Sequence, residues 1–178
     1  MLDGEKNIIE GAILGEASAF GLLYDHYQPR IYRFIYLKVS HREEAEDLTH
    51  QVFLGAWQNI GNYQFKGFPF SSWLYQIARN QVIDYYRTKK KNVSLENIVE
   101  PEVESSSEKT IDGDLDIKKV RQAITRLSQE QQDVIIMRFI EDLSPQETAK
   151  ALNKSNGAVR LIQFRAIRNL RKILNPKS

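Results

Sequence analysis

The sequence predicts an all-α protein with two small helical domains, joined by a flexible acidic linker, and a helix-turn-helix in the second domain. Apolar residues recur at helical spacing through most of the chain. Residues 92–116 lack that period and are rich in Glu, Asp and Ser. Near the C-terminus, a short capped segment precedes a long basic one. We therefore expect a first domain over 1–91, the linker over 92–116 and a second domain over 117–178.

The composition excludes several classes of protein. A chain of 178 residues suffices for one or two small domains. Because it contains no cysteine, it has no disulfide framework, thiolate zinc site or cysteine nucleophile. No apolar run approaches the length of a membrane span, and the N-terminus lacks a signal-peptide pattern. We expect a soluble, cytoplasmic protein without membrane insertion.

The net charge of +2 conceals a strong pattern along the chain. Residues 1–60 carry a net −4, residues 61–91 carry +5, residues 92–116 carry −7 and residues 117–178 carry +8. Two basic blocks therefore flank an acidic bridge. This pattern predicts two separate surfaces for binding a polyanion.

The first domain begins with helical patterns. Residues 16–39 predict one or two helices, with Pro29 as a point of kinking or breaking. Ser40 and Glu43 have capping-box spacing and predict a helix over 40–60. Its acidic first turn either simply stabilises the helix N-terminus or docks a basic protein surface.

Residues 61–72 have loop chemistry, with two glycines and one proline, yet carry several aromatic residues. About half of these aromatics are expected in the core. Aromatics beside Lys66 also suit stacking on unpaired bases. Ser71 or Ser72 is expected to cap a basic helix that runs to Lys91. An aromatic loop leading into a basic helix suits single-stranded or distorted DNA.

The second domain is predicted to contain four helices. The first spans 117–127. Capping-box spacings start two more, at Ser128 with Gln131 and at Ser144 with Glu147. The last of these is short and is followed by a turn and the final helix, as in a helix-turn-helix.

The final helix, from Ser155 to Leu174, has two chemically different sides. An apolar arc faces one way, and an arginine-rich side with Leu161 and Phe164 faces the other. The helix contains no Asp or Glu, whereas ordinary solvated faces mix charges. We predict that it enters the DNA major groove, where arginine forks suit guanine edges and phosphates. Leu161 and Phe164 either contact thymine methyl groups or are covered by a protein partner.

No catalytic or metal-binding constellation emerges from the sequence. The three histidines are scattered without ligand spacing, and phosphate-binding glycine loops and nucleophile elbows are absent. We expect no enzymatic activity, no cofactor, no metal and no small-molecule substrate.

Three segments, in this order, resemble the bacterial sigma factors of the extracytoplasmic-function (ECF) group: EEAEDLTHQVFLGAWQNI, FPFSSWLYQIARNQVIDYYRTKKK and LSPQETAKALNKSNGAVRLIQFRAIRNLRKIL. The resemblance covers roughly residues 16–174. It implies an alternative sigma factor that binds core RNA polymerase, recognises the −10 and −35 promoter elements, and melts promoter DNA for transcription initiation. It also implies an anti-sigma factor as partner. Such a protein would be associated with the nucleoid when active, and at the membrane where an anti-sigma factor holds it there.

The resemblance also implies a role for individual residues. Core polymerase would be bound by Asp47, Leu48, Gln51, Phe53 and Trp57, some of which would be internal packing. The −10 element would be bound and melted by Tyr63, Phe65, Lys66, Phe68, Arg79, Asn80, Asp84 and Arg87. The −35 element would be bound by Arg160, Leu161, Phe164, Arg165 and Arg168. Many relatives have a small polar and a basic residue where this chain has Leu161 and Ile162, so the −35 sequence preference does not transfer.

Two alternatives remain at this stage. One is a helix-turn-helix regulator that binds an operator without polymerase, which leaves the aromatic loop unexplained. The other is a sigma-like adaptor that binds polymerase but whose helix-turn-helix does not recognise DNA.

Overall fold

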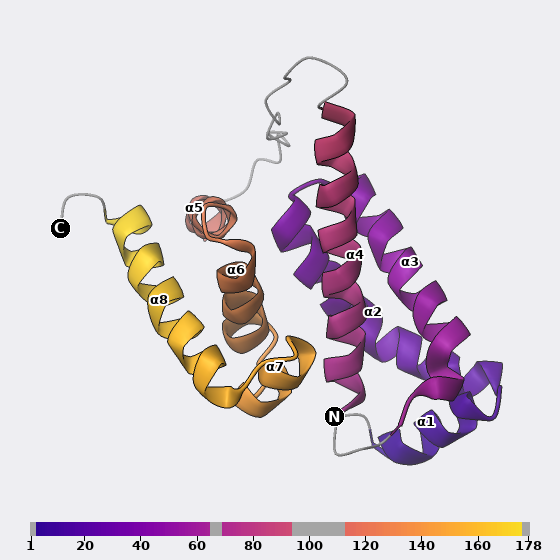
Figure 1. The fold of residues 1–178 in the computed structure, drawn as a ribbon. Helices are drawn as coiled ribbons and strands as arrows, with labels where there is room; N and C mark the ends of the chain where they lie inside the picture. The colour runs from indigo at the N-terminus through magenta and orange to yellow at the C-terminus, as the bar shows by residue number, and fades with distance from the viewer. Residues whose placement is uncertain (1–2, 65–68, 94–112, 176–178) are drawn as a thin grey trace.

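The computed structural model describes residues 3–64, 69–93 and 113–175, and these residues contain helices and no strand. They form two helical domains that lie side by side (Figure 1). The predicted all-α fold with two domains is thus confirmed. Among the described residues, no helix is long and apolar enough to cross a membrane.

The first domain has four helices and one short turn. They are α1 (Glu5–Ile13), α2 (Ala17–Val39), α3 (Arg42–Asn59), the 3-10 turn η1 (Ile60–Asn62) and α4 (Phe70–Val93). Helix α2 packs against α1, α3 and α4, and continues through Pro29 without a break. Buried aromatic pairs, such as Phe34 with Tyr75, fill the space between α2 and α4.

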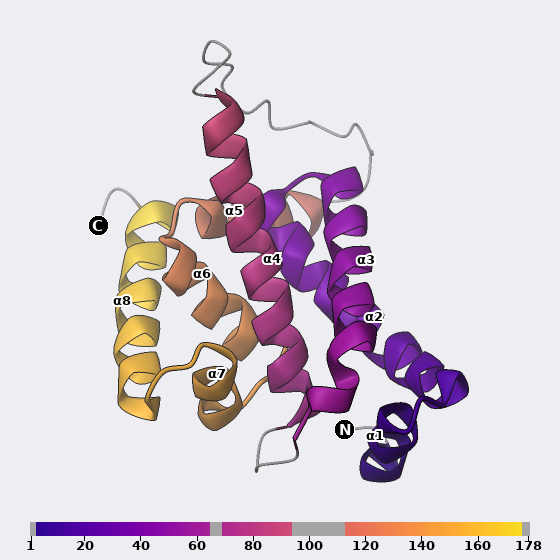
Figure 2. The same ribbon diagram turned by 45° about the vertical axis from the view of Figure 1, so that its right-hand side comes forward.

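The second domain ends in the predicted helix-turn-helix. Its elements are α5 (Gly113–Thr125), α6 (Gln129–Ile135), the π-helical turn η2 (Ile136–Ile140), α7 (Pro145–Ala151) and α8 (Asn156–Leu174). Helix α8 packs on α5, α6 and α7. Figure 2 shows α6 and α7 on the side of α4, with α8 on the outer edge.

Two of the predicted helix caps in the second domain are confirmed. Ser144 Oγ accepts from the Glu147 N–H at 3.1 Å, and the Glu147 carboxylate accepts from the Ser144 N–H at 2.7 Å. These two bonds form the capping box at the start of α7. Ser155 Oγ likewise accepts from the Ala158 N–H at the start of α8.

Other predicted caps were wrong. Ser40 does not cap α3, because it ends α2 in the left-handed region (φ 56°) with its N–H bonded to Tyr36. Ser128 stands at the N-cap of α6 but makes no side-chain capping bond. Its predicted capping partner, Gln131, instead accepts from Asn169 of α8. Capping spacing is a local signal, and it shows neither where the preceding helix ends nor that Gln131 bonds to a residue of another helix.

The start of α4 also differs from the prediction. The helix begins at Phe70, so Ser71 and Ser72 lie within its first turn rather than before it. The Ser72 hydroxyl donates to the backbone carbonyl of Glu147 in α7. Of the predicted linker, residues 92–93 belong to α4 and residues 113–116 to α5; the remainder lies outside the described residues.

Candidate nucleic-acid interfaces and the contact between the domains

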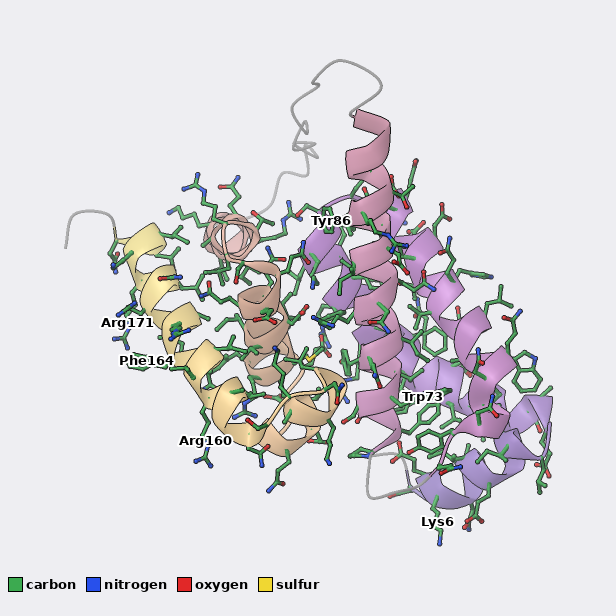
Figure 3. The ribbon with its side chains drawn as sticks, viewed as in Figure 1. Lys6, Trp73, Tyr86, Arg160, Phe164 and Arg171 are labelled. Carbon is green, nitrogen blue, oxygen red and sulfur yellow. The ribbon has the colours of Figure 1, made fainter. Side chains whose placement is uncertain are left out.

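The helix-turn-helix presents one exposed side of α8 to solvent. Val159 and Ala166 are completely buried against the rest of the domain. On the opposite side, Phe164 is 65% exposed, and Figure 3 shows it pointing away from the domain with Arg160 and Arg171. All five residues predicted for −35 binding are exposed: Arg160, Leu161, Phe164, Arg165 and Arg168. The structure therefore brings them together on one accessible face.

Helix α4 carries a second exposed polar stripe. Asn80, Asp84 and Arg87 are exposed, and their spacing puts them on one side of the helix. Asp84 and Arg87 form an ion pair at 3.1 Å, which contributes little stability at such an exposed position. Three more of the residues predicted for −10 binding, Phe65, Lys66 and Phe68, lie outside the described residues.

Tyr63 is part of the packing beside this stripe. It is buried, with its ring centroid 5.5 Å from that of Phe70 and 5.2 Å from that of Trp73. Burial raises the pKa of Tyr63 to about 12. A hollow of about 290 Å³ adjoins it, lined from the second domain by Lys150 and Asn153. Tyr63 thus forms a wall of this hollow and is not an exposed stacking platform.

The residues predicted for polymerase binding divide into two groups. Asp47 and Gln51 are exposed on α3, whereas Leu48 and Phe53 are buried in the core. Trp57 is partly exposed. The structure thus gives Leu48 and Phe53 a packing role.

An apolar hollow next to Trp57 was missed by the sequence analysis. It has a volume of about 200 Å³, and Phe20, Leu54 and Trp57 are among its lining residues. Leu54 is 54% exposed, and the rings of Phe20 and Trp57 lie 4.9 Å apart. The signal was present in the sequence, because Leu54 lies three residues before Trp57 and so shares its face of the helix.

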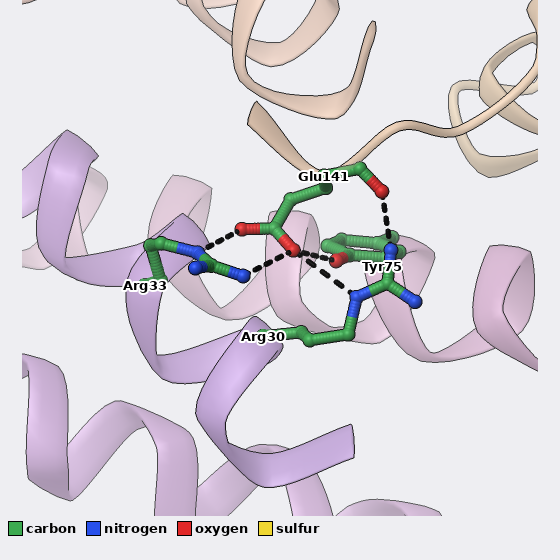
Figure 4. A network of polar contacts seen from close by, with 4 residues as sticks. All are labelled: Arg30, Arg33, Tyr75 and Glu141. Atoms are coloured by element: carbon green, nitrogen blue, oxygen red, sulfur yellow. Dashed lines mark hydrogen bonds and ion pairs between the residues drawn. The ribbon is translucent and has the colours of Figure 1, made fainter. Parts of the chain in front are cut away.

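A buried glutamate joins the two domains. Glu141 is 1% exposed and follows η2 in the second domain. Its carboxylate accepts from Arg30 at 3.2 Å, from Arg33 at 2.6 and 3.2 Å, and from the Tyr75 hydroxyl at 3.0 Å (Figure 4). Its backbone carbonyl also accepts from Arg30. All of these donors belong to α2 and α4 of the first domain.

A buried aspartate makes a second connection. Asp133 of α6 is completely buried and accepts from Lys38 of α2, and from Arg79 Nε of α4 at 2.9 Å. Lys38 is buried as well. Burial lowers the pKa of the Lys38 ammonium, although the nearby Asp133 carboxylate opposes this. Arg79, which was predicted to contact DNA, is therefore bound by an acid of the second domain.

The π-helical turn helps both acids to face the first domain. Asp133 and Glu141 are eight residues apart, which in a regular α-helix would leave them about 80° apart around the axis. The Glu141 N–H bonds to the carbonyl of Ile136, five residues earlier. This wider turn reduces the rotation per residue, so the two side chains point in similar directions. No sequence pattern predicted this turn.

Each of the two domains matches a known protein family. Residues 23–92 match the family model of Sigma-70 region 2, and residues 123–172 match that of Sigma-70, region 4. ECF RNA polymerase sigma factor BldN of Streptomyces coelicolor is 38% identical over 170 residues, which cover 94% of this chain and 64% of BldN. The chain thus spans less than two thirds of that relative.

Two further matches extend over nearly the whole chain. ECF RNA polymerase sigma factor SigW of Bacillus subtilis is 31% identical over 180 residues, covering 95% of this chain and 96% of SigW. The fold is similar to CnrH in its complex with the cytosolic domain of CnrY, with a TM-score of 0.76 and 21% identity over 98% of this chain and 99% of CnrH. Because it matches both Sigma-70 regions and is more than 30% identical to SigW over nearly the whole of both chains, the chain belongs to the ECF group of RNA polymerase sigma factors.

Proposed function

We propose that this alternative sigma factor uses three separate surfaces. Helix α8 recognises the −35 element, the exposed stripe of α4 holds the −10 element, and α3 binds core RNA polymerase. The observation that carries this proposal is the pair of exposed polar faces on α4 and α8, one in each domain, matching the two sigma regions.

The α8 surface suits duplex DNA. Its arginines extend from a rigid helix whose N-terminus is capped by Ser155, and a guanidinium fork fits guanine edges and phosphates. Leu161 and Phe164 give the same face an apolar contact for thymine methyl groups. Arg160 and Leu161 lie in its N-terminal part, where recognition helices contact base edges.

The α4 surface suits opened DNA. Asn80 offers both a donor and an acceptor on the exposed stripe, so it can bind the edge of an unpaired base. Arg87 follows two turns later and suits the phosphate backbone. Trp73 is partly exposed beside the N-terminal end of α4, where bases leaving the duplex would stack, and the buried Tyr63 packs against it.

The polymerase surface combines polar side chains with an apolar hollow. Asp47 and Gln51 are exposed on α3, and Leu54 and Trp57 follow on the same helix. An apolar centre with a polar rim is the usual anatomy of a protein interface. We add Leu54 to the residues assigned to polymerase binding. Leu48 and Phe53 belong to the hydrophobic core of the first domain, beneath this surface.

The mechanism is recruitment and strand opening, without bond chemistry. Once both domains are held on polymerase, each raises the effective concentration of the other at the promoter. An anti-sigma factor is a further partner in this proposal, since the sigma factor RpoE of Bartonella quintana, which has a similar fold, was solved in complex with the anti-sigma factor NepR. The exposed apolar residues of α8 offer such a partner a contact.

Run-off transcription with purified core polymerase and genomic fragments tests the proposal. Defined start sites that appear only with this protein would support it, and their alignment would supply the −10 and −35 sequences. If core polymerase were bound but no start appeared, the adaptor hypothesis would replace it. If core polymerase were not bound, an operator-binding regulator would be the better interpretation.

A further inference from the structure

The contact between the domains covers the flank of α4 next to its DNA-binding stripe. Helix α7 packs against α4, and Ser72 donates to the Glu147 carbonyl across that contact at 3.1 Å. Lys150 and Asn153 close one side of the hollow that contains Trp73 and Gln76. In this arrangement the second domain occupies space beside the N-terminal end of α4, where the −10 strand would enter.

This closed arrangement cannot span a promoter. The −10 and −35 elements are separated by roughly 25 base pairs, or about 85 Å at about 3.4 Å per base pair. Here α8 packs on α6 and α7, and α7 packs on α4. Two helix diameters of about 10–12 Å each therefore separate the two DNA-binding helices. The domains must move apart before both elements can be bound at once.

We propose that the acids Asp133 and Glu141 form an autoinhibitory latch, which holds the free chain closed and keeps α4 from promoter DNA. This inference rests on the proposed function, because it concerns the same α4 surface. The latch has two parts: Asp133 with Lys38 and Arg79, and Glu141 with Arg30, Arg33 and Tyr75.

The composition of the latch suits a reversible contact. Asp133 and Glu141 are buried in the closed chain, and their side-chain partners in the described residues all lie on α2 and α4 of the first domain. When the domains separate, water can solvate both acids and their cationic partners. A polar contact of this kind favours one closed geometry but can be exchanged for contacts with polymerase and DNA.

The latch also makes Arg79 a switch between two acidic partners. In the closed chain, Arg79 is neutralised by Asp133. On the promoter, the same guanidinium is proposed to contact phosphate. The two states exclude each other, so loss of Asp133 should favour the DNA-bound state.

Distance measurements test the latch without polymerase or DNA. Because the chain has no cysteine, spin labels can be attached at Ser18→Cys in α2 and Lys172→Cys in α8, both exposed. We expect one narrow distance distribution for the free parent chain. Glu141→Gln and Asp133→Asn should each produce a broader distribution at longer distances. Arg33→Gln, an exposed change on the other side of the contact, should act in the same direction.

A matched control removes a charge elsewhere. Glu10→Gln breaks the exposed Lys6–Glu10 pair within α1 and should keep the narrow distribution. The latch would be refuted if the parent chain were already broadly distributed, or if all three latch variants kept the parent distance. Circular dichroism must show that each variant retains its helices; Arg33→Gln serves as the test where a buried variant does not fold.

A binding measurement tests inhibition. Single-stranded oligonucleotides carrying the −10 sequence from run-off mapping should bind Asp133→Asn about tenfold more tightly than the parent chain. A tenfold gain is expected if about one tenth of the parent molecules are open and able to bind DNA, and nearly all molecules of the variant are open. Equal affinities would show that closure does not inhibit. If distances changed as expected but the parent chain gave no promoter-specific transcription, the proposed function would fail while the interdomain contact would stand.

Discussion

Arg79 Nε donates to the Asp133 carboxylate over 2.9 Å, and this bond joins α4 of the first domain to α6 of the second. Arg79 therefore lies on the flank of α4 that faces the second domain, whereas Asn80, the next residue, is exposed. Adjacent positions on one helix thus serve different purposes in the closed chain. This difference makes Asn80 the cleaner probe of −10 binding.

Asn80→Ala and Arg160→Ala should separate the two promoter functions. Arg160→Ala should weaken binding of a duplex −35 fragment about fivefold to a hundredfold, the loss expected for one base contact of about 1–3 kcal/mol. Asn80→Ala should leave that binding unchanged and reduce promoter opening, measured by permanganate reactivity of the −10 region. The same defect in both variants would show that the division between α4 and α8 is incorrect.

Leu161 should contact a thymine methyl group in the −35 element. Replacing thymine by deoxyuridine, one position at a time in the −35 element, removes a single methyl. If Leu161 covers that methyl, removing the methyl should cost about 0.8 kcal/mol of binding free energy. Binding should then be about fourfold weaker for the replacement at that one position. Leu161→Ala should bind both DNAs alike at this position. The contact would be disproved if the parent protein tolerated every such replacement without loss.

Leu54 should contribute to polymerase binding because it lies in the apolar hollow of α3. Leu54→Asp should weaken holoenzyme assembly at least tenfold, measured by competition for core polymerase, because a charge would be buried in an apolar contact. Leu22→Asp is a matched control, since Leu22 is 53% exposed and Leu54 is 54% exposed. Equal losses in the two variants would argue against a specific role for this hollow.

Helical periodicity predicted α8 well because the pattern is local. Val159 and Ala166 fall on the apolar arc and are buried, while Arg160 and Phe164 fall opposite and are exposed. Both outcomes follow from the 3.6-residue repeat. The same logic correctly predicted the helix-turn-helix and its caps at Ser144 and Ser155.

Long-range contacts could not be predicted in this way. Lys38 and Asp133 are 95 residues apart and Arg33 and Glu141 are 108 apart, and nothing in the local pattern pairs them. The resemblance assigned Arg79 to the −10 element, and nothing in its local sequence indicates that it also pairs with a buried acid of the other domain. Likewise, the local pattern did not show which residues of the polymerase-binding set are internal packing, and tertiary packing buries Phe53 against Tyr24.

Alkaline pH should destabilise the fold through its buried tyrosines. Burial raises the pKa of Tyr63 to about 12, and burial with nearby carboxylates raises those of Tyr27 and Tyr75 further. In the unfolded chain these phenols lose their protons near pH 10. Between about pH 10 and 12 the unfolded state therefore binds fewer protons than the folded state, and the free energy of unfolding falls. Below pH 10 this contribution is fully present.

Urea unfolding at a series of pH values would measure that effect. Tyr63→Phe should reduce the fall in the free energy of unfolding at alkaline pH. It removes one titrating phenol while keeping the ring that packs against Phe70 and Trp73. For Tyr63 alone, the difference between about 10 and about 12 corresponds to at most about 2–3 kcal/mol. A parent chain whose stability did not change over this range would contradict the burial of these rings.

The capping box of α7 should contribute more to the free energy of unfolding than the similar sequence before α6. Ser144→Ala removes the bond from the Glu147 N–H and should destabilise the second domain by about 1 kcal/mol. Ser128→Ala should cost only a few tenths of that, because Ser128 makes no side-chain capping bond. Urea unfolding, with hydrogen exchange of the α7 amides, would measure both changes. Equal costs would mean that Ser144 does not cap α7 in solution, and the support of α7 for α8 would then rest on packing alone.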